Sequence, residues 1–126
     1  MSSVESAEWR RCKPWIEAAL AYAHGTHTIK DIESGIAAGK FQFWPGRECA
    51  AVTEIIVYPR LTALNFFLLG GDLDELLNDM EPAVCAWAKS IGVSRVFGVG
   101  RKGFERVLKS KGYAPMWTYC SKELSS

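Results

Sequence analysis

The sequence lacks the clustered cysteines and histidines that hold a structural metal. Its two histidines, His24 and His27, flank Gly25 and have no carboxylate motif beside them. Its four cysteines all lie more than thirty positions apart, so none forms a Cys-x-x-Cys pair: Cys12, Cys49, Cys85 and Cys120. We therefore expect no metal site, and four reduced cysteines packed as small apolar core side chains.

The chain also has little excess of charge and no long apolar run. Its 15 Lys and Arg residues balance 14 Asp and Glu residues, for a net charge of +1, whereas a dedicated nucleic-acid binder normally has a strong basic excess. The longest apolar stretches, such as Leu64–Leu69, have the length of a strand, far below the roughly 20 residues that cross a bilayer. The N-terminus has no apolar signal core. We expect no nucleic-acid partner, no membrane association and a cytoplasmic location.

What the sequence contains is enough apolar material for one domain. Of its 126 residues, 48% are hydrophobic and 23% charged, which are values of a globular protein and not of a disordered one. There is no internal repeat, low-complexity run or linker. We therefore expect a single domain over residues 1–126 with an ordered core over about 8–120.

The first half of the chain changes its apolar period once. A period of 3.6 residues predicts a helix over residues 8–23, and a second, short helix begins after Thr28 as N-cap and ends at Gly39. The period then becomes two. The short alternation at residues 41–43, the β-branched run Ala50–Tyr58 and the run Thr62–Leu69 predict an antiparallel meander, with a turn at 44–46.

The second half returns to helices and strands in alternation. Gly70 and Gly71 are expected to stop the third strand, and Pro82 to divide the next helical region, leaving a main helix near Glu81–Ile91. A strand over Val93–Val99 is predicted to lie parallel to the third strand. A helix at 103–110 and a last strand at 114–120 complete the chain. The fold class is therefore α/β (α+β), with a mixed, mostly antiparallel twisted sheet flanked by helices in the order α-α-β-β-β-α-β-α-β.

The Gly70-Gly71 pair marks one candidate ligand site. Glycines after a buried strand let backbone amides approach a ligand, and the start of the following helix attracts phosphate. The same residues also have a purely structural interpretation, since Gly-Gly-Asp is a common way to leave a strand and cap a helix. In addition, Asp72, Asp74 and Glu75 would repel a phosphate. The residues alone leave both interpretations open.

Several stretches resemble one enzyme superfamily. They are TEIIVYPR, LNFFLLGGDLDELL and WAKSIGVSRVFGVGRKGFERVLKSKGY, followed by an apolar C-terminal stretch. Over about residues 8–120 the chain resembles the GNAT (Gcn5-related N-acetyltransferase) superfamily, and more narrowly the small GNAT-like proteins of tailed bacteriophages and prophages. The resemblance implies a GNAT-like element order, with acetyl-CoA in a V-shaped gap between strands at residues 64–69 and 95–99.

The resemblance also implies where the coenzyme pyrophosphate would bind. The family's loop, Gln/Arg-x-x-Gly-x-Gly/Ala, corresponds to Leu68, Leu69, Gly70, Gly71, Asp72 and Leu73 of this chain. Two glycines are present, but the leading Gln or Arg and the spaced glycine are missing. Arg101 and Lys102 precede a helix start and are predicted either to meet a CoA phosphate or an acidic partner, or simply to be solvated.

In this superfamily the amine attacks the thioester directly, with a base that takes its proton and an acid that protonates the leaving thiolate. Glu54, on the central strand, fits the position of the base, and its alternative is an ordinary solvated strand residue. Tyr113 lies near the place of the acid, and its alternative is an apolar contact to the preceding helix. The resemblance therefore predicts Glu54 and Tyr113 as the catalytic pair.

Two functions follow. The first is an N-acetyltransferase that moves an acetyl group from acetyl-CoA to an unidentified amine. The second is a noncatalytic virion-associated or assembly protein on the same fold, located in the host cytoplasm or the virion. Charge favours an interaction role, because residues 101–111 carry +4 and residues 72–81 carry −5. These two segments are predicted either to be solvated helix faces or to mediate self-association or docking onto phage structural proteins.

Overall fold

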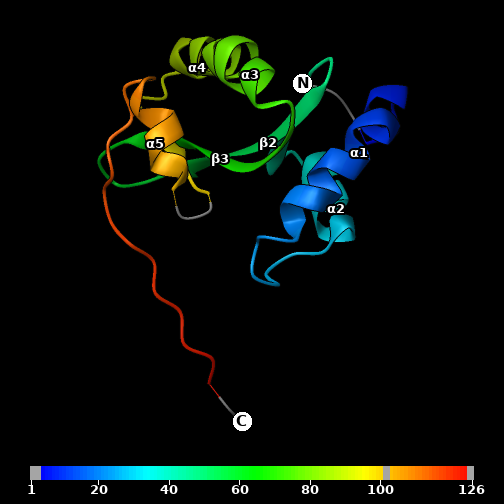
Figure 1. The fold of residues 1–126 in the computed structure, drawn as a ribbon, viewed down its shortest axis with the longest axis horizontal. Helices are drawn as coiled ribbons and strands as arrows, with labels where there is room; N and C mark the ends of the chain where they lie inside the picture. The colour runs from blue at the N-terminus through cyan, green and yellow to red at the C-terminus, as the bar shows by residue number, and fades with distance from the viewer. Residues whose placement is uncertain (1–3, 101–102, 125–126) are drawn as a thin grey trace.

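The computed structural model describes residues 4–100 and 103–124, which form a mixed four-stranded sheet with helices on both faces (Figure 1). The strands lie in chain order across the sheet: β1 Phe41–Pro45, β2 Cys49–Val57, β3 Thr62–Gly71 and β4 Arg95–Gly98. β1, β2 and β3 pair antiparallel, and β4 pairs parallel to β3. The predicted α+β class and the parallel fourth strand are confirmed.

The helices form a layer on each side of the sheet. On one side lie α1 Ala7–Leu20 and α2 Ile29–Ala37, and on the other α3 Leu73–Glu75, the π-helix η1 Leu76–Met80 and α4 Glu81–Ser90 (Figure 1). α5, Phe104–Lys109, follows β4. Within the described residues, no helix has the length and apolarity needed to cross a membrane.

A separate hydrophobic core lies under each helical layer. α1 and α2 pack on a cluster in which the Trp9 indole meets the Phe43 ring edge-on, with ring centroids 4.9 Å apart. The Trp9 ring nitrogen donates to Glu33 Oε2 at 2.8 Å, so the one polar group of this buried indole is satisfied. On the other face, η1 and α4 cover Leu64 and Phe66 of β3. Side chains of β3 thus alternate between two cores, as an interior strand requires.

The structure confirms the predicted N-cap of α2 and the predicted place of Pro82 near the start of α4. Thr28 and Asp31 cap α2 reciprocally, with Asp31 N donating to Thr28 Oγ1 at 3.3 Å and Thr28 N donating to Asp31 Oδ2 at 2.8 Å. Pro82 has no backbone N–H and stands in the first turn of α4. The helical ladder widens just before it, where the Glu81 N–H bonds to the Leu76 carbonyl.

β3 is longer than the sequence predicts. Gly70 and Gly71 do not stop it, because they pair with Ala50 and Cys49 of β2. A side chain at Gly70 would collide with the backbone carbonyl of Trp15 in α1. The diglycine therefore continues the strand at a place where α1 approaches the sheet too closely for a β-carbon.

The predicted last strand, at residues 114–120, is wrong. Residues 113–124 carry no regular secondary structure, and Figure 1 shows this segment leaving the body of the molecule. Pro115 cannot donate a ladder hydrogen bond near its start. Tyr119 is 82% exposed and Cys120 is also exposed, so neither is a core residue. The core prediction for cysteines holds for Cys12 and Cys49, which are buried.

Candidate functional site

The candidate site begins where β3 and β4 part. The two strands pair over four positions, from Ala63↔Arg95 to Phe66↔Gly98. β4 ends there, whereas β3 runs on to Gly71. A parallel pair that ends while one strand continues leaves a gap at the carboxyl end of the sheet, which is the usual place for a ligand in such sheets.

A β-bulge marks the same point of β3. Val52 pairs with Leu68 and Thr53 with Phe66, so the register passes over Phe67. Phe67 and Leu68 consequently point to the same face of the sheet, where both pack against the core under α1 and α2. The extra residue bends β3 directly after its last pair with β4. Bulges of this kind are frequent beside binding sites because they redirect the strand.

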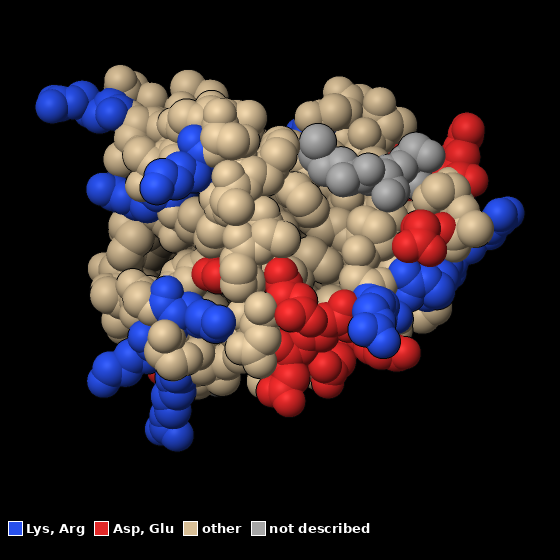
Figure 2. Space-filling model, turned by 90° about the horizontal axis from the view of Figure 1, so that it is seen from above, with Lys and Arg blue, Asp and Glu red and all other residues tan. Residues whose placement is uncertain are grey.

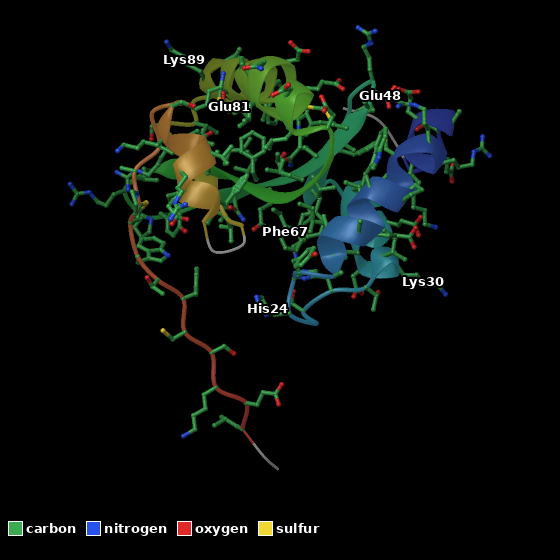
Figure 3. All side chains as sticks on the ribbon, viewed as in Figure 1. His24, Lys30, Glu48, Phe67, Glu81 and Lys89 are labelled. Atoms are coloured by element: carbon green, nitrogen blue, oxygen red, sulfur yellow. The ribbon has the colours of Figure 1, made fainter. Side chains whose placement is uncertain are left out.

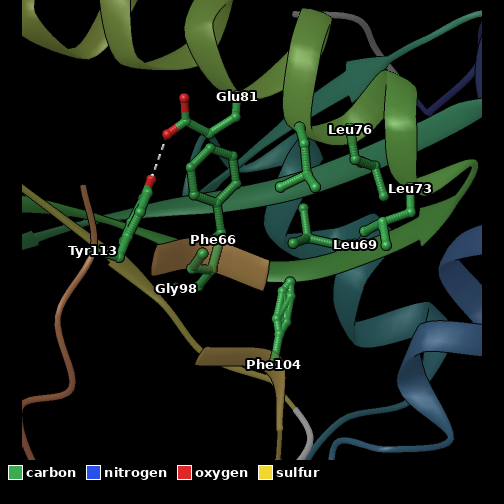
Figure 4. A pocket seen from close by; sticks show the side chains of 10 residues that line it. Phe66, Leu69, Leu73, Leu76, Glu81, Gly98, Phe104 and Tyr113 are labelled. Carbon is green, nitrogen blue, oxygen red and sulfur yellow. Dashed lines mark hydrogen bonds between the residues drawn. The ribbon is translucent and has the colours of Figure 1, made fainter. Parts of the chain in front are cut away.

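An apolar pocket lies at this gap and is bounded by β3, the end of β4, α3, η1 and α5 (Figure 4). Gly98 gives it room, since a β-carbon there would lie 2.7 Å from Leu108 Cδ1. The pocket is narrow and holds space for about one water molecule. It is lined by Phe66, Leu69, Leu73, Leu76, Leu77, Glu81, Gly98, Phe104, Leu108 and Tyr113.

The polar groups of this pocket are Tyr113 and Glu81. The Tyr113 hydroxyl donates to Glu81 Oε2 at 2.8 Å (Figure 4). Cys85 Sγ lies 4.0 Å from the same hydroxyl. Burial, reinforced by the bond to Glu81, raises the pKa of Tyr113 well above its usual value. Burial likewise raises the pKa of the Cys85 thiol to about 11. At neutral pH the pocket therefore holds a protonated phenol, and the Cys85 thiol next to this phenol is protonated as well.

Of the residues predicted for coenzyme binding and catalysis, the structure brings three to this pocket: Leu69, Leu73 and Tyr113. Leu68 is buried in the opposite core. Gly70 and Gly71 lie in the β2–β3 ladder, where a side chain would strike the backbone of Trp15 and Glu48 respectively. These contacts give the diglycine a packing role, and its role in holding pyrophosphate stays a prediction.

Asp72 belongs to an acidic surface cleft beside the pocket. Its side chain accepts from Glu75 N at 3.0 Å and caps α3, while its own N–H bonds to the Glu48 carbonyl at 2.8 Å. Figure 2 shows acidic side chains gathered into one patch, with basic side chains spread around it. The cleft is lined by Arg47, Glu48, Asp72, Asp74, Glu75, Asn78 and Asp79. This charge opposes a phosphate at the start of α3.

Glu54 lies on the other face of the sheet from the pocket. It accepts a hydrogen bond from Asn65 Nδ2 at 3.0 Å. Asn65 stands between Leu64 and Phe66, which both face η1 and α4, so alternation directs Asn65 and Glu54 toward the side of α1 and α2. In Figure 3, Glu81 and Phe67 are labelled on the two opposite sides of the sheet. The predicted base and acid thus approach the gap from opposite faces.

Two predicted residues, Arg101 and Lys102, lie outside the described residues. Within residues 4–100 and 103–124, no three of His, Cys, Asp and Glu are grouped to hold a metal ion.

Sequence reasoning missed Glu81, Gly98 and Asn65. Glu81 and Tyr113 are 32 positions apart, so nothing local links them. Asn65 did carry a signal, because an amide inside a strand with apolar residues on both sides is a buried polar group that needs partners.

Comparison with known proteins supports the fold alone. No protein-family model matches the sequence, and no curated protein matches it significantly. Among solved structures, the chain is similar to TTHA1254 of Thermus thermophilus, with a TM-score of 0.61 and 19% identity for the wild type and 0.64 and 18% for a point mutant; each comparison covers 96% of this chain and 95% of that one. It is also similar to a tetramutant of BH1408 from Bacillus halodurans, with a TM-score of 0.66 and 12% identity over 98% of this chain and 97% of the other.

Proposed function

We propose that the protein is an acyl-CoA-dependent N-acetyltransferase with a GNAT-like arrangement of its sheet. The observation that carries the proposal is the parting of the parallel strands β3 and β4 after Phe66↔Gly98, with a bulge at Phe67 and an apolar pocket at that point. A pantetheine arm is long and narrow, and its acetyl-thioester end is apolar, so this end fits such a gap. The pocket is narrow, so entry of this arm requires the α5 side chains Phe104 and Leu108 to move aside.

The chemistry is a direct transfer between two bound substrates. The amine nitrogen attacks the thioester carbon, the C–N bond forms, and the C–S bond breaks with release of CoA as a thiolate. Tyr113 donates its hydroxyl proton to that sulfur, since burial keeps the phenol protonated at neutral pH. The phenolate left behind takes back the proton that the nitrogen loses as the tetrahedral intermediate collapses to the amide. Glu81 orients the phenol through the 2.8 Å hydrogen bond. Most of the rate gain comes from aligning the amine with the thioester.

Glu54 takes the proton that the attacking ammonium must lose, through a water molecule. Its carboxylate is half-buried and is held by Asn65 on the face away from the pocket. The amine therefore approaches from the α1 and α2 side while the thioester enters from the pocket side. The parted strands are where the two substrates meet.

Coenzyme affinity would come mainly from the apolar pocket. The loop that follows β3 is acidic at Asp72, Asp74 and Glu75, and this charge weakens pyrophosphate binding there. The basic residues Arg101 and Lys102 remain the predicted phosphate contacts. A ligand that offers pantetheine and thioester should therefore bind better than its nucleotide half alone.

Thermal unfolding with added acetyl-CoA tests this proposal. Saturation at about 100 times the dissociation constant stabilises the fold by roughly 2.7 kcal/mol, whereas ADP should produce a much smaller shift. The variant Gly98→Ala narrows the pocket against a flexible leucine end and should lose most of the acetyl-CoA shift. Val57→Ala, at an exposed site on β2, serves as the control. The absence of any shift with millimolar acetyl-CoA would rule out the transferase.

A second candidate function is a noncatalytic assembly component, such as a virion-associated phage or prophage protein. The observation that favours it is the C-terminal arm, defined as residues 114–124, which exposes large apolar side chains. Trp117 is 60% exposed, Tyr119 82% and Leu124 85%. Monomeric proteins seldom leave such a run uncovered. The arm and the acidic cleft would then serve self-association or docking onto particle proteins.

Light scattering at low and high salt distinguishes the two functions. The two charges in question are the basic segment 101–111 and the acidic segment 72–81. If they drive self-association, the oligomer should dissociate as salt rises, because the Debye length falls to about 3 Å at 1 M salt. If the apolar arm drives it, salt should not dissociate the oligomer. An assembly protein without catalysis should self-associate and fail to respond to acetyl-CoA.

A further inference from the structure

One row of side chains crosses the sheet on the face of α1 and α2. The register places Phe41 of β1, Glu54 of β2, Asn65 of β3 and Phe97 of β4 directly opposite one another. Residues paired in register point to the same face. The row therefore consists of a carboxylate and an amide between two phenyl rings. Its Asn65↔Phe97 pair directly precedes Phe66↔Gly98, the last pair of β3 with β4.

The amide in this row has an unsatisfied oxygen. Asn65 is only 9% exposed, and within the described part of the chain its Oδ1 is buried without a hydrogen-bond partner. The amide orientation is fixed by its other end, since Nδ2 donates to Glu54 Oε1 at 3.0 Å. A flipped amide would set oxygen against the carboxylate. Leaving a buried acceptor unpaired costs about 1–3 kcal/mol, so this oxygen is better explained by a donor that binds there.

The chemistry of the row selects the donor. An anion is excluded, because the row presents an amide oxygen next to a carboxylate. A calcium ion requires about 6 or more oxygen ligands, which two side chains do not supply. A primary ammonium group carries a positive charge and three N–H donors, of which one can bond to Asn65 Oδ1 and another to Glu54 through a water molecule.

The surroundings of the row select what carries the ammonium. The Phe67 ring lies beside Phe41 with centroids 5.6 Å apart, and the Trp117 ring lies 6.0 Å from Phe97. Aromatic faces attract a cation and also cover an apolar body. A small amine with an aromatic or alkyl body matches this lining better than a polar polyamine.

We propose that Asn65 Oδ1 and Glu54 form a binding subsite for a primary ammonium group carried on an apolar body. As the acceptor site of a transferase it rests on the proposed function, whereas as an ammonium site it stands on the Asn65–Glu54 pair alone. The oxygen is closed in this structure, so a neighbouring side chain moves when the amine enters. The subsite names the substrate class as small apolar primary amines.

The test uses 2-phenylethylammonium as the probe and 2-phenylethanol as its uncharged counterpart. Titration of the whole protein, followed by calorimetry and by the NMR signal of the Asn65 side-chain amide, should show binding of the ammonium and none of the alcohol. Asn65→Leu keeps the size of the side chain and removes the oxygen, and Glu54→Gln removes the charge. Each should weaken ammonium binding at least tenfold. Glu48→Gln, the same charge change in the acidic cleft, should leave binding unaltered.

Stability separates a binding role from a structural one. Asn65→Leu removes the unpaired buried acceptor together with the hydrogen bond to the half-buried Glu54 carboxylate. These two effects on stability oppose each other, so this variant should unfold close to the temperature of the parent protein. A marked loss of stability would show that the amide serves the fold. If Asn65→Leu fails to fold, Glu54→Gln, at a half-buried position, decides the matter through binding alone.

The two proposals fail in different ways. Equal binding of amine and alcohol, no binding of either, or equal loss in Glu48→Gln would overturn the ammonium subsite. Titration of the same samples with acetyl-CoA decides the transferase separately. Amine binding without acetyl-CoA binding would leave the subsite standing and remove the transferase, and the converse result would remove only the subsite.

Discussion

At the scale of single residues, Glu75 shows how the acidic cleft serves the fold itself. Its two carboxylate oxygens accept from Arg47 N and Glu48 N, each at 2.7 Å, and thereby close the turn between β1 and β2. These backbone bonds lower the pKa of Glu75 below its ordinary 4.5. A carboxylate committed in this way is not available to a cation, and it repels a phosphate nearby.

Replacing this carboxylate should therefore cost stability in a pH-dependent way. Glu75→Gln leaves one acceptor for two N–H donors, and at this half-buried site we expect a loss of about 1 kcal/mol in the free energy of unfolding. A lowered pKa stabilises the folded state above the ordinary value of 4.5, and this contribution disappears as the pH falls through the folded pKa. Urea unfolding at pH 7 and pH 3 should show this difference between variant and parent at pH 7 and a smaller one at pH 3. An equal difference at both pH values would contradict the role of the charge.

Tyr113 is the residue on which the proposed chemistry depends most directly. Tyr113→Phe keeps the ring in the pocket and removes the proton donor to the thiolate. We expect kcat for acetyl transfer to fall about a hundredfold with little change in acetyl-CoA affinity. Cys85→Ala, which alters the neighbouring thiol, is the control and should cost far less. Unchanged kcat in Tyr113→Phe would exclude the phenol as the acid.

At the scale of the elements, β3 determines where everything else lies. It pairs with β2 along its whole length, but with β4 only over residues 63–66. The bulge at Phe67 comes directly after the part that pairs with β4. The glycine end of β3 lets α1 approach the sheet, on the face toward which Glu54 and Asn65 also point. The element boundaries are therefore as important for the site as the side chains in it.

Because α1 approaches the sheet closely at Gly70, we expect alanine to cost more stability there than at Gly98. Gly70→Ala would press a β-carbon into the backbone of Trp15, which cannot yield, and should cost about 1–3 kcal/mol or more. Gly98→Ala meets only the flexible end of Leu108 and should cost clearly less. Thermal unfolding of both variants checks the order. Equal losses would mean that the contact between α1 and β3 is not limiting.

At the scale of the whole molecule, two helical layers enclose a sheet while the C-terminal arm stays outside. The arm touches the body through Trp117, whose ring meets Phe97 on β4. Its other apolar side chains are exposed. The arm therefore adds little to the stability of the domain, and its apolar surface is available for association.

Truncation after Tyr113 tests this division between body and arm. We expect the free energy of unfolding to change by no more than about 1 kcal/mol, because little apolar area is covered by the arm. If the arm mediates self-association, the truncated protein should also become monomeric in light scattering. Trp117→Ala in the full chain serves as a milder comparison. Loss of cooperative unfolding on truncation would show that the arm belongs to the core.

The sequence by itself determined the α+β class, the helices α1 and α2, the meander and the parallel return of β4. Periodicity, the Thr28 cap and the position of Pro82 in the first turn of α4 depend on neighbouring residues, so they can be read along the chain. Only the tertiary structure decided the end of β3, the fate of residues 114–120, and the pairings Glu81–Tyr113 and Glu54–Asn65. Each of these depends on a partner distant in sequence, and a strand forms only where another strand completes its hydrogen bonds.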